Sequence, residues 1–276
     1  MSASTSHHSG VAVLAAKVVL APGFVVGVSV LARRFGARIG GFAGALPVVA
    51  GPILLVYALA HGRAFGADAA AGTLLGLVSL TAFVAVYSHL AGRTTWSISL
   101  LAGWGAFLLA TALLSALSVP ASGALLLAGA AIGAALVILP RARADRGPSA
   151  QPPTWDLPLR AVSALALVLA LTAAAGWLGP RLSGLLAPFP VIASVLAAFA
   201  HAQRGSAYTQ RLLRGLVAGF VAFALFCFTL AISLRSLGRP DHGLGRLSAG
   251  ALASRRPGVP ASCCIRRRPA ASGQYG

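Results

Sequence analysis

Long apolar runs separated by short basic gaps make up most of the chain. A helix that crosses a bilayer needs about 20 apolar residues, and several runs reach that length before an arginine or a glycine ends them. Trp96–Pro140 is too long for one span and is broken at Pro120, so we interpret it as two helices. The pattern predicts an all-α, polytopic membrane protein of about eight transmembrane helices: Val11–Ala32, Ile39–Ala60, Asp68–Leu90, two within Trp96–Pro140, Leu159–Leu178, Leu182–Ala202 and Leu212–Leu234.

A short pattern occurs twice at a constant offset of 143 residues, the difference between Gly179 and Gly36. Both copies read GxRxxG, an apolar spacer and Pro-Val, and the same offset pairs Gly62 with Gly205. Repeats at fixed register indicate a duplicated architecture. Five predicted spans separate matching positions; because five is odd, the copies would insert in opposite senses. Such inverted-topology repeats recur in secondary transporters. A single re-entrant segment over Trp96–Pro140 would instead make the copies parallel.

The composition favours the membrane class. The chain is 58% hydrophobic and 9% charged, with a mean hydropathy of +0.85, whereas about a quarter of the residues of a soluble domain are charged. The net charge of +18 does not indicate a nucleic-acid partner, because the arginines stand in gaps between apolar runs and in the C-terminal tail. The first, third, fifth and seventh gaps hold most of the loop arginines. By the positive-inside rule, we expect a multi-pass membrane protein with its N-terminus outside.

Prolines interrupt two of the predicted spans at matching places. Pro47, Gly51 and Pro52 fall within the second span, and Pro188 and Pro190 fall within the seventh. Proline removes a backbone donor and clashes with the preceding turn, so each helix should kink or unwind there. A matched pair of interrupted helices is a pointer to a central substrate site. The alternative is that the prolines only bend the helices for packing.

Three basic residues complete the predicted substrate-binding set. Arg38 and Arg181 are expected at the mouths of the two interrupted helices, as anion-attracting groups or as interfacial anchors. Lys17 lies inside the first span, where it could bind a solute or extend to the interface. No acidic residue lies deep in a span, so a neutral or anionic solute is favoured over a cation. No Ser/His/Asp, Cys/His or metal-ligand pattern occurs, so we expect neither an enzyme nor a cofactor.

The domain organisation follows from these runs. We expect a disordered N-terminus (1–10), a first repeat (11–140), a cytoplasmic Arg/Pro-rich linker (141–158), a truncated second repeat (159–234) and a basic disordered tail (235–276). The repeat predicts two further helices where the tail stands. Two interpretations stay open: a shift of reading frame soon after Leu234, or a genuine basic extension.

The stretch Arg34–Ala50 and the lysine early in the first span resemble the GlpM-like family of small bacterial inner-membrane proteins, over about Val11–Leu117 and, more faintly, Leu159–Leu234. Those proteins resemble a single repeat, so the resemblance implies two copies fused head to tail, in the bacterial plasma (inner) membrane. Two functions are carried forward: a transporter or permease-like protein with its site between the second and seventh helices, and a non-transporting membrane scaffold or assembly factor. The expected partners are the lipid bilayer, a small solute and further copies of the chain.

Overall fold

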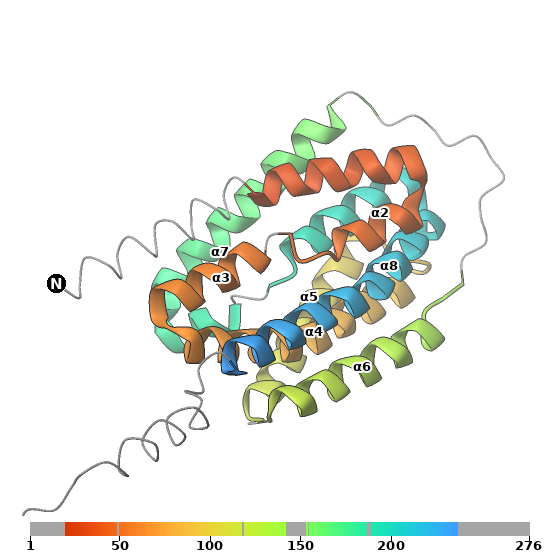
Figure 1. Cartoon of the computed structure of the whole chain (residues 1–276). Coiled ribbons are helices and arrows are strands. Elements are labelled where there is room, and N and C mark those ends of the chain that lie inside the picture. Colours follow the sequence, from red (N-terminus) through yellow and green to blue (C-terminus); the bar gives the residue numbers. More distant parts are fainter. Residues whose placement is uncertain are drawn as a thin grey trace, which may run out of the picture. The chain divides into compact units, whose positions relative to one another are not determined.

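The computed structural model describes residues 20–48, 50–117, 119–141, 153, 155–186 and 189–236. For residues 53, 56, 57, 60, 61, 172 and 174–186 it describes the backbone alone. Every regular element in these ranges is a helix, and no strand occurs among them. An N-terminal helix is described over residues 20–35. It is followed by α2 (Ala37–Gly44), α3 (Ala50–His61), α4 (Arg63–Leu90), α5 (Trp96–Ser115), α6 (Ala121–Ile138), α7 (Asp156–Leu186) and α8 (Val191–Ser236) (Figure 1).

Four of these helices, α4, α5, α6 and α8, are long and apolar enough to cross a membrane. The prediction of an all-α protein that is compatible with a membrane is therefore confirmed. Large apolar side chains on α5 and α6 remain exposed, among them Leu101 at 63%, Leu113 at 66% and Leu126 at 74%. An apolar outer surface is costly in water and is the surface that lipid tails would cover.

Three glycines with positive φ mark where the chain changes direction. Gly36 (φ 95°) separates the N-terminal helix from α2, and Gly62 (φ 92°) separates α3 from α4. Gly205 (φ 76°) divides α8 into two helical parts, before and after a kink. Residues with a Cβ rarely adopt this backbone conformation, so glycine is required at such positions. The break between the predicted seventh and eighth spans is thus a kink at one residue, where the sequence predicted a loop.

The α4 and α8 helices form the centre of the packing. They contact one another, and each also contacts α5 and α6; α4 further contacts α3, and α8 further contacts α2 and α7. The buried core includes Phe83, Tyr87, Phe107, Leu196 and Leu213, each fully inaccessible. The described helices therefore pack around α4 and α8, which lie far apart in the sequence.

Glycines allow α2 and the second part of α8 to approach backbone to backbone. A Cβ added to Gly41 would lie 1.9 Å from the carbonyl oxygen of Leu212, and one added to Gly215 would lie 2.1 Å from that of Arg38. This is the close packing that small residues four apart permit in membranes. The glycine spacing also occurs at Gly129 and Gly133 on α6, where an added Cβ would meet no atom within 4 Å. Glycines at this spacing thus lie in the contact between α2 and α8 but on an uncovered surface of α6.

Two predicted boundaries differ from the structure. The gap expected between Leu178 and Leu182 lies inside the continuous α7, whereas the matching Gly36 ends its helix. In addition, α7 begins at Asp156, within the predicted linker, where the Asp156 carboxylate is held by Arg33 and Gln203 from other helices. The expected disordered N-terminus, most of the linker and the tail from residue 237 lie outside the described residues.

Candidate functional site

The interruption of the second predicted span centres on Pro47. The α2 helix ends at Gly44 and α3 begins at Ala50. The Val48 N–H donates to the Leu46 carbonyl at 2.8 Å, an inverse γ-turn pattern around the proline. The Pro47 carbonyl then accepts the first bond of the new helix, from Gly51 N–H at 2.8 Å. The chain therefore leaves the helix for about one turn and restarts it directly after the proline.

The same pair of hydrogen bonds occurs at Pro190. The Val191 N–H donates to the Phe189 carbonyl at 2.8 Å, and the Ser194 N–H donates to the Pro190 carbonyl at 2.8 Å. Each residue here stands 143 positions after its counterpart at Pro47. The chain is non-helical at both prolines, as predicted, and the two breaks share the same pair of hydrogen bonds.

The two interrupted segments also touch. A Cβ placed on Gly44, just before the Pro47 break, would lie 3.1 Å from Leu196 Cδ1, less than two turns after the Pro190 break. Aromatic side chains hold the second break in place. Phe189 packs on Trp104, with ring centroids 5.3 Å apart, and the Trp104 Nε1–H donates to the buried Ser194 Oγ at 2.8 Å. The sequence analysis did not find Trp104, because nothing local relates α5 to the start of α8.

The other predicted site residues are dispersed. Gly51 is buried near the Phe226 ring, while Pro52 and Arg38 are exposed. Arg181 lies in α7, where only the backbone is described, and Lys17 and Pro188 lie outside the described residues.

The most polar buried cluster surrounds Asp156, the first residue of α7. Its carboxylate is fully buried and forms ion pairs with Arg33 of the N-terminal helix and with Arg160, whose Nε lies 2.9 Å from both oxygens. The Gln203 amide of α8 also donates to it. One carboxylate thus joins three helices. Its position at the start of α7 adds a favourable interaction with the helix dipole.

The arginines hold the Asp156 carboxylate in its charged form. Burial by itself raises the pKa of this carboxyl, but the charge of Arg160 and the hydrogen bonds from Arg160, Gln203 and Arg33 more than offset it, so the pKa lies below its ordinary value. Asp156 lies outside the four candidate membrane spans. The ion pairs therefore persist at neutral pH.

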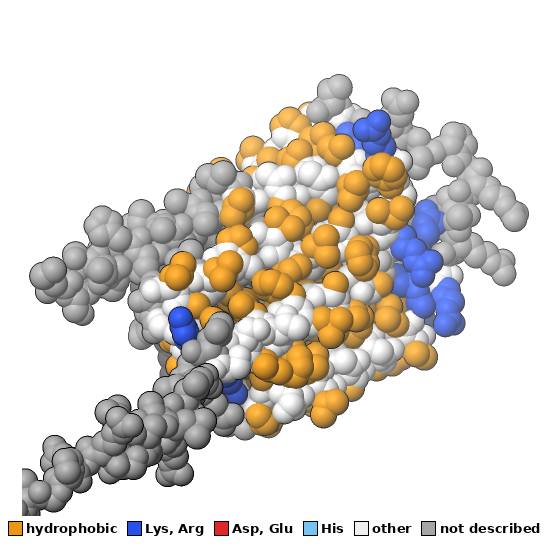
Figure 2. All heavy atoms as spheres, viewed as in Figure 1, with side chains coloured by type: hydrophobic (Ala, Val, Ile, Leu, Met, Phe, Trp, Pro, Cys, Tyr) orange, Lys and Arg blue, Asp and Glu red, His pale blue; other side chains and the backbone are white. Residues whose placement is uncertain are grey.

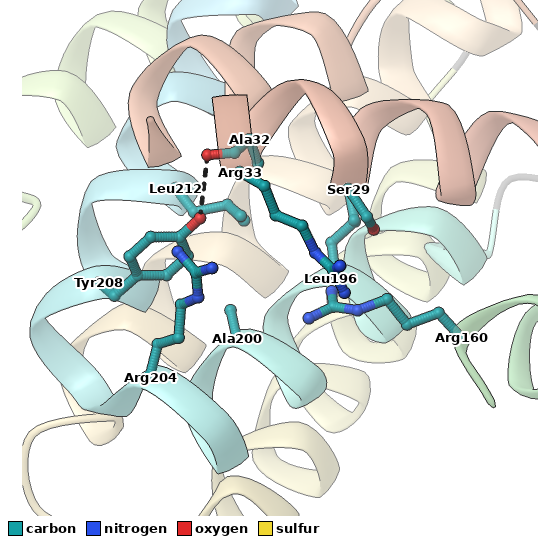
Figure 3. A pocket seen from close by; sticks show the side chains of 9 residues that line it. All are labelled: Ser29, Ala32, Arg33, Arg160, Leu196, Ala200, Arg204, Tyr208 and Leu212. Carbon is teal, nitrogen blue, oxygen red and sulfur yellow. Dashed lines mark hydrogen bonds between the residues drawn. The ribbon is translucent and has the colours of Figure 1, made fainter. Parts of the chain in front are cut away.

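A cleft opens beside this cluster (Figure 3). Its apolar side is formed by Ala32, Leu196, Ala200 and Leu212, and its polar side by Ser29, Arg33, Arg160, Arg204 and Tyr208. Arg33 and Arg160 point toward one another from the N-terminal helix and α7, and Arg204 reaches the same space from α8 (Figure 3). The enclosed space is about 10 Å³, room for about one water molecule.

The sequence contained one usable signal for this cluster. Asp156 and Arg160 are four residues apart at the start of an apolar run, a spacing that forms ion pairs on a helix. Because the predicted linker included Asp156, this ion-pair spacing was not recognised. The contributions of Arg33, 123 positions before Asp156, and of Gln203 follow only from the tertiary packing.

Figure 2 shows most of the Lys and Arg side chains on the face in view at one end of the described helices and a few at the other. Arg33, Arg160 and Arg204 share the cleft, and the charges of Arg38 and Arg141 act on Arg214. The sequence predicted that the first, fifth and seventh gaps lie on one side of the membrane, and this stays a prediction.

Comparisons of this chain with protein-family models, with curated proteins and with solved structures find no match. The resemblance to the GlpM-like family therefore stays a prediction.

Proposed function

We propose that this chain is a transporter or permease-like protein of the bacterial plasma membrane for a small neutral or anionic solute. The observation that carries the proposal is the pair of breaks at Pro47 and Pro190, which share the same two hydrogen bonds at a sequence offset of 143 residues. Matched interrupted helices are the arrangement from which many secondary transporters build a central substrate site. The site lies between the second and seventh spans, that is, between α2/α3 and the first part of α8.

The breaks supply the chemistry that such a site needs. Where a helix stops, its last carbonyl groups and the next helix's first N–H groups have no partner within the helix. In hydrocarbon these groups must be satisfied by protein or by a water-filled cavity. A small polar solute can take the same hydrogen bonds. No carboxylate belongs to the predicted site, which favours a neutral or anionic solute over a cation.

An inverted repeat of eight spans supports this function. The N-terminal helix, α2 with α3, α4, α5, α6, α7 and the two parts of α8 would each cross once. The Pro47 break then lies within the second crossing and the Pro190 break at the start of the seventh. These two crossings run in opposite directions, and the second repeat ends early. Under the positive-inside rule the arginine-rich end is cytoplasmic and the N-terminus lies outside. The paired positive-φ glycines, Gly62 and Gly205, add to the likeness of the copies.

Cysteine accessibility tests the inverted repeat. Ala37→Cys and Ser183→Cys would be made separately in a background with Cys227, Cys263 and Cys264 changed to Ser. A membrane-impermeant maleimide should label residue 37 from the cytoplasm alone and residue 183 from outside alone. Labelling of both from one side would make the repeats parallel and remove the main support for a transporter.

Permeability tests the function itself. Proteoliposomes would be placed in iso-osmotic glycerol, urea or sodium formate, and swelling would be followed by light scattering. Pro47→Ala and Pro190→Ala should lower the protein-dependent rate, whereas Pro120→Ala, which changes a proline at the start of α6, should not. Equal rates with and without the protein for every solute, together with co-purification of a membrane partner, would favour the alternative, a scaffold or assembly factor.

A further inference from the structure

The cleft beside Asp156 carries more positive than negative charge. Arg33, Arg160 and Arg204 face it, and Asp156 is the carboxylate that the described residues place there. Of the other three acidic residues, Asp68 pairs with the exposed Arg235, and Asp145 and Asp241 lie outside the described ranges. Three guanidinium groups and one carboxylate leave an excess of two positive charges at one small site.

The contacts with Asp156 fix the orientation of Arg33 and Arg160 but use only some of their N–H donors. Asp156 is contacted by Nε of Arg160 and by Nη2 of Arg33. In the part of the chain that the structure describes, the two Nη atoms of Arg160 donate to no other residue. The Arg160 guanidinium also stacks on the Phe199 ring, 5.0 Å from its centroid. Its orientation is therefore held from both sides while its terminal nitrogens stay available.

Arg204 stacks on an aromatic ring, and no carboxylate of the described residues pairs with it. Its guanidinium carbon lies 4.6 Å from the centroid of the Tyr208 ring, and Tyr208 in turn donates a hydrogen bond to the Ala32 carbonyl at 3.4 Å. A ring face attracts a cation but cancels none of its charge. Figure 3 shows this pair across the cleft from Arg33 and Arg160.

We propose that this cleft binds a phosphate group, supplied by free inorganic phosphate or by the headgroup of an anionic phospholipid. Planar guanidinium groups bind oxyanions through paired hydrogen bonds. A phosphate has more acceptor oxygens than a carboxylate and can take bonds from three arginines at once. Because the enclosed space holds about one water molecule, the group sits in the mouth, where Arg33 is 27% exposed, and one or two of its oxygens reach inward.

This site is separate from the breaks at Pro47 and Pro190 and goes beyond the proposed transport function. Binding can be measured without any transport assay. A protein that fails the permeability test can still bind phosphate, and a protein that passes it can fail to bind. The two proposals are therefore refuted by different results.

The test uses the full-length protein purified in a maltoside detergent, with thermal unfolding as the readout. In the first arm, sodium phosphate is titrated against sodium chloride at equal ionic strength. In the second arm, phosphatidylglycerol is added and compared with phosphatidylcholine. Saturable stabilisation by phosphate identifies free phosphate as the source, and stabilisation by phosphatidylglycerol alone identifies the lipid. Either result supports the proposal.

Arg204→Gln is the decisive variant, because Arg204 faces the cleft without contacting Asp156. It should weaken the affinity for whichever ligand stabilises the wild type by about tenfold or more, the usual effect of losing a charged hydrogen-bond donor. Arg204→Lys keeps the positive charge but lacks the planar guanidinium group, so its affinity should lie between those of the wild type and Arg204→Gln. If Arg204→Gln does not fold, Arg204→Lys serves as the test variant. Arg34→Gln removes the same charge from an exposed neighbour of Arg33 and should bind as the wild type does. No stabilisation in either arm, or an equal loss in Arg34→Gln, overturns the proposal.

Discussion

The close approach of α2 and α8 gives the most direct test of the packing. In Gly215→Ala the new Cβ would lie 2.1 Å from the Arg38 carbonyl oxygen, and 2.9 Å and 3.0 Å from the Arg38 carbonyl carbon and Cα. Reaching ordinary contact at 3.4 Å requires the helices to separate by about 1.3 Å, the difference between 3.4 and 2.1 Å. The obstacle is backbone, so no side-chain rotation relieves it.

Two opposing terms set the expected size of the effect. Replacing glycine by alanine inside a helix stabilises it by about 1 kcal/mol. Overpacking costs about 1–3 kcal/mol and occasionally more, and a clash this short with backbone belongs at or above the upper end. We expect a net loss of about 2 kcal/mol. For a chain of this size that corresponds to a Tm lower by roughly 4–8 °C.

The assay is thermal unfolding of the purified protein in detergent, at one scan rate for every variant because membrane proteins often unfold irreversibly. Gly133→Ala is the matched control, since it makes the same change on a helix where an added Cβ meets nothing within 4 Å. Its Tm should equal or exceed that of the wild type. If Gly215→Ala is as stable as Gly133→Ala, the backbone contact between α2 and α8 is not present in the protein.

Three further outcomes are expected from the same unfolding assay. Asp156→Asn should destabilise the protein by about 3 kcal/mol, because it leaves the buried Arg160 without its counter-charge. Asp68→Asn removes an ion pair whose side chains are 50% and 73% exposed, so it should change stability by less than about 1 kcal/mol. Equal effects of the two substitutions would contradict the burial of Asp156. The Asp156 contribution should be complete above the ordinary pKa of 3.8 and be lost as the pH falls through the lower folded pKa, so a Tm profile between about pH 2 and pH 6 should flatten in Asp156→Asn. Gly62→Ala and Gly205→Ala, at φ 92° and 76°, should each cost about 1–2 kcal/mol, and a neutral result would remove the bend at that residue.

Much of the fold could be predicted because its causes are local. The break at Pro120 predicted two helices between Trp96 and Pro140, and α5 and α6 lie on either side of it. Pro47 and Pro190 interrupt their helices because proline lacks the N–H that a helix needs. The predicted boundary between the sixth and seventh spans, between Leu178 and Leu182, was wrong. The chain continues through Gly179 and Pro180 as α7, although Gly36, the repeat partner of Gly179, ends its helix.

The sequence by itself determined the class of the protein and the places where its helices break, since apolar runs and prolines act on the chain locally. Tertiary structure alone decided which partners meet. The arginines of the first, fifth and seventh gaps come together only when the N-terminal helix, α7 and α8 pack side by side, and Asp156 is buried only in that assembly. A charge on an isolated helix is bound by water; inside the packed helices it must find an opposite charge. That requirement joins Arg33, Asp156 and Arg160 and creates the cleft.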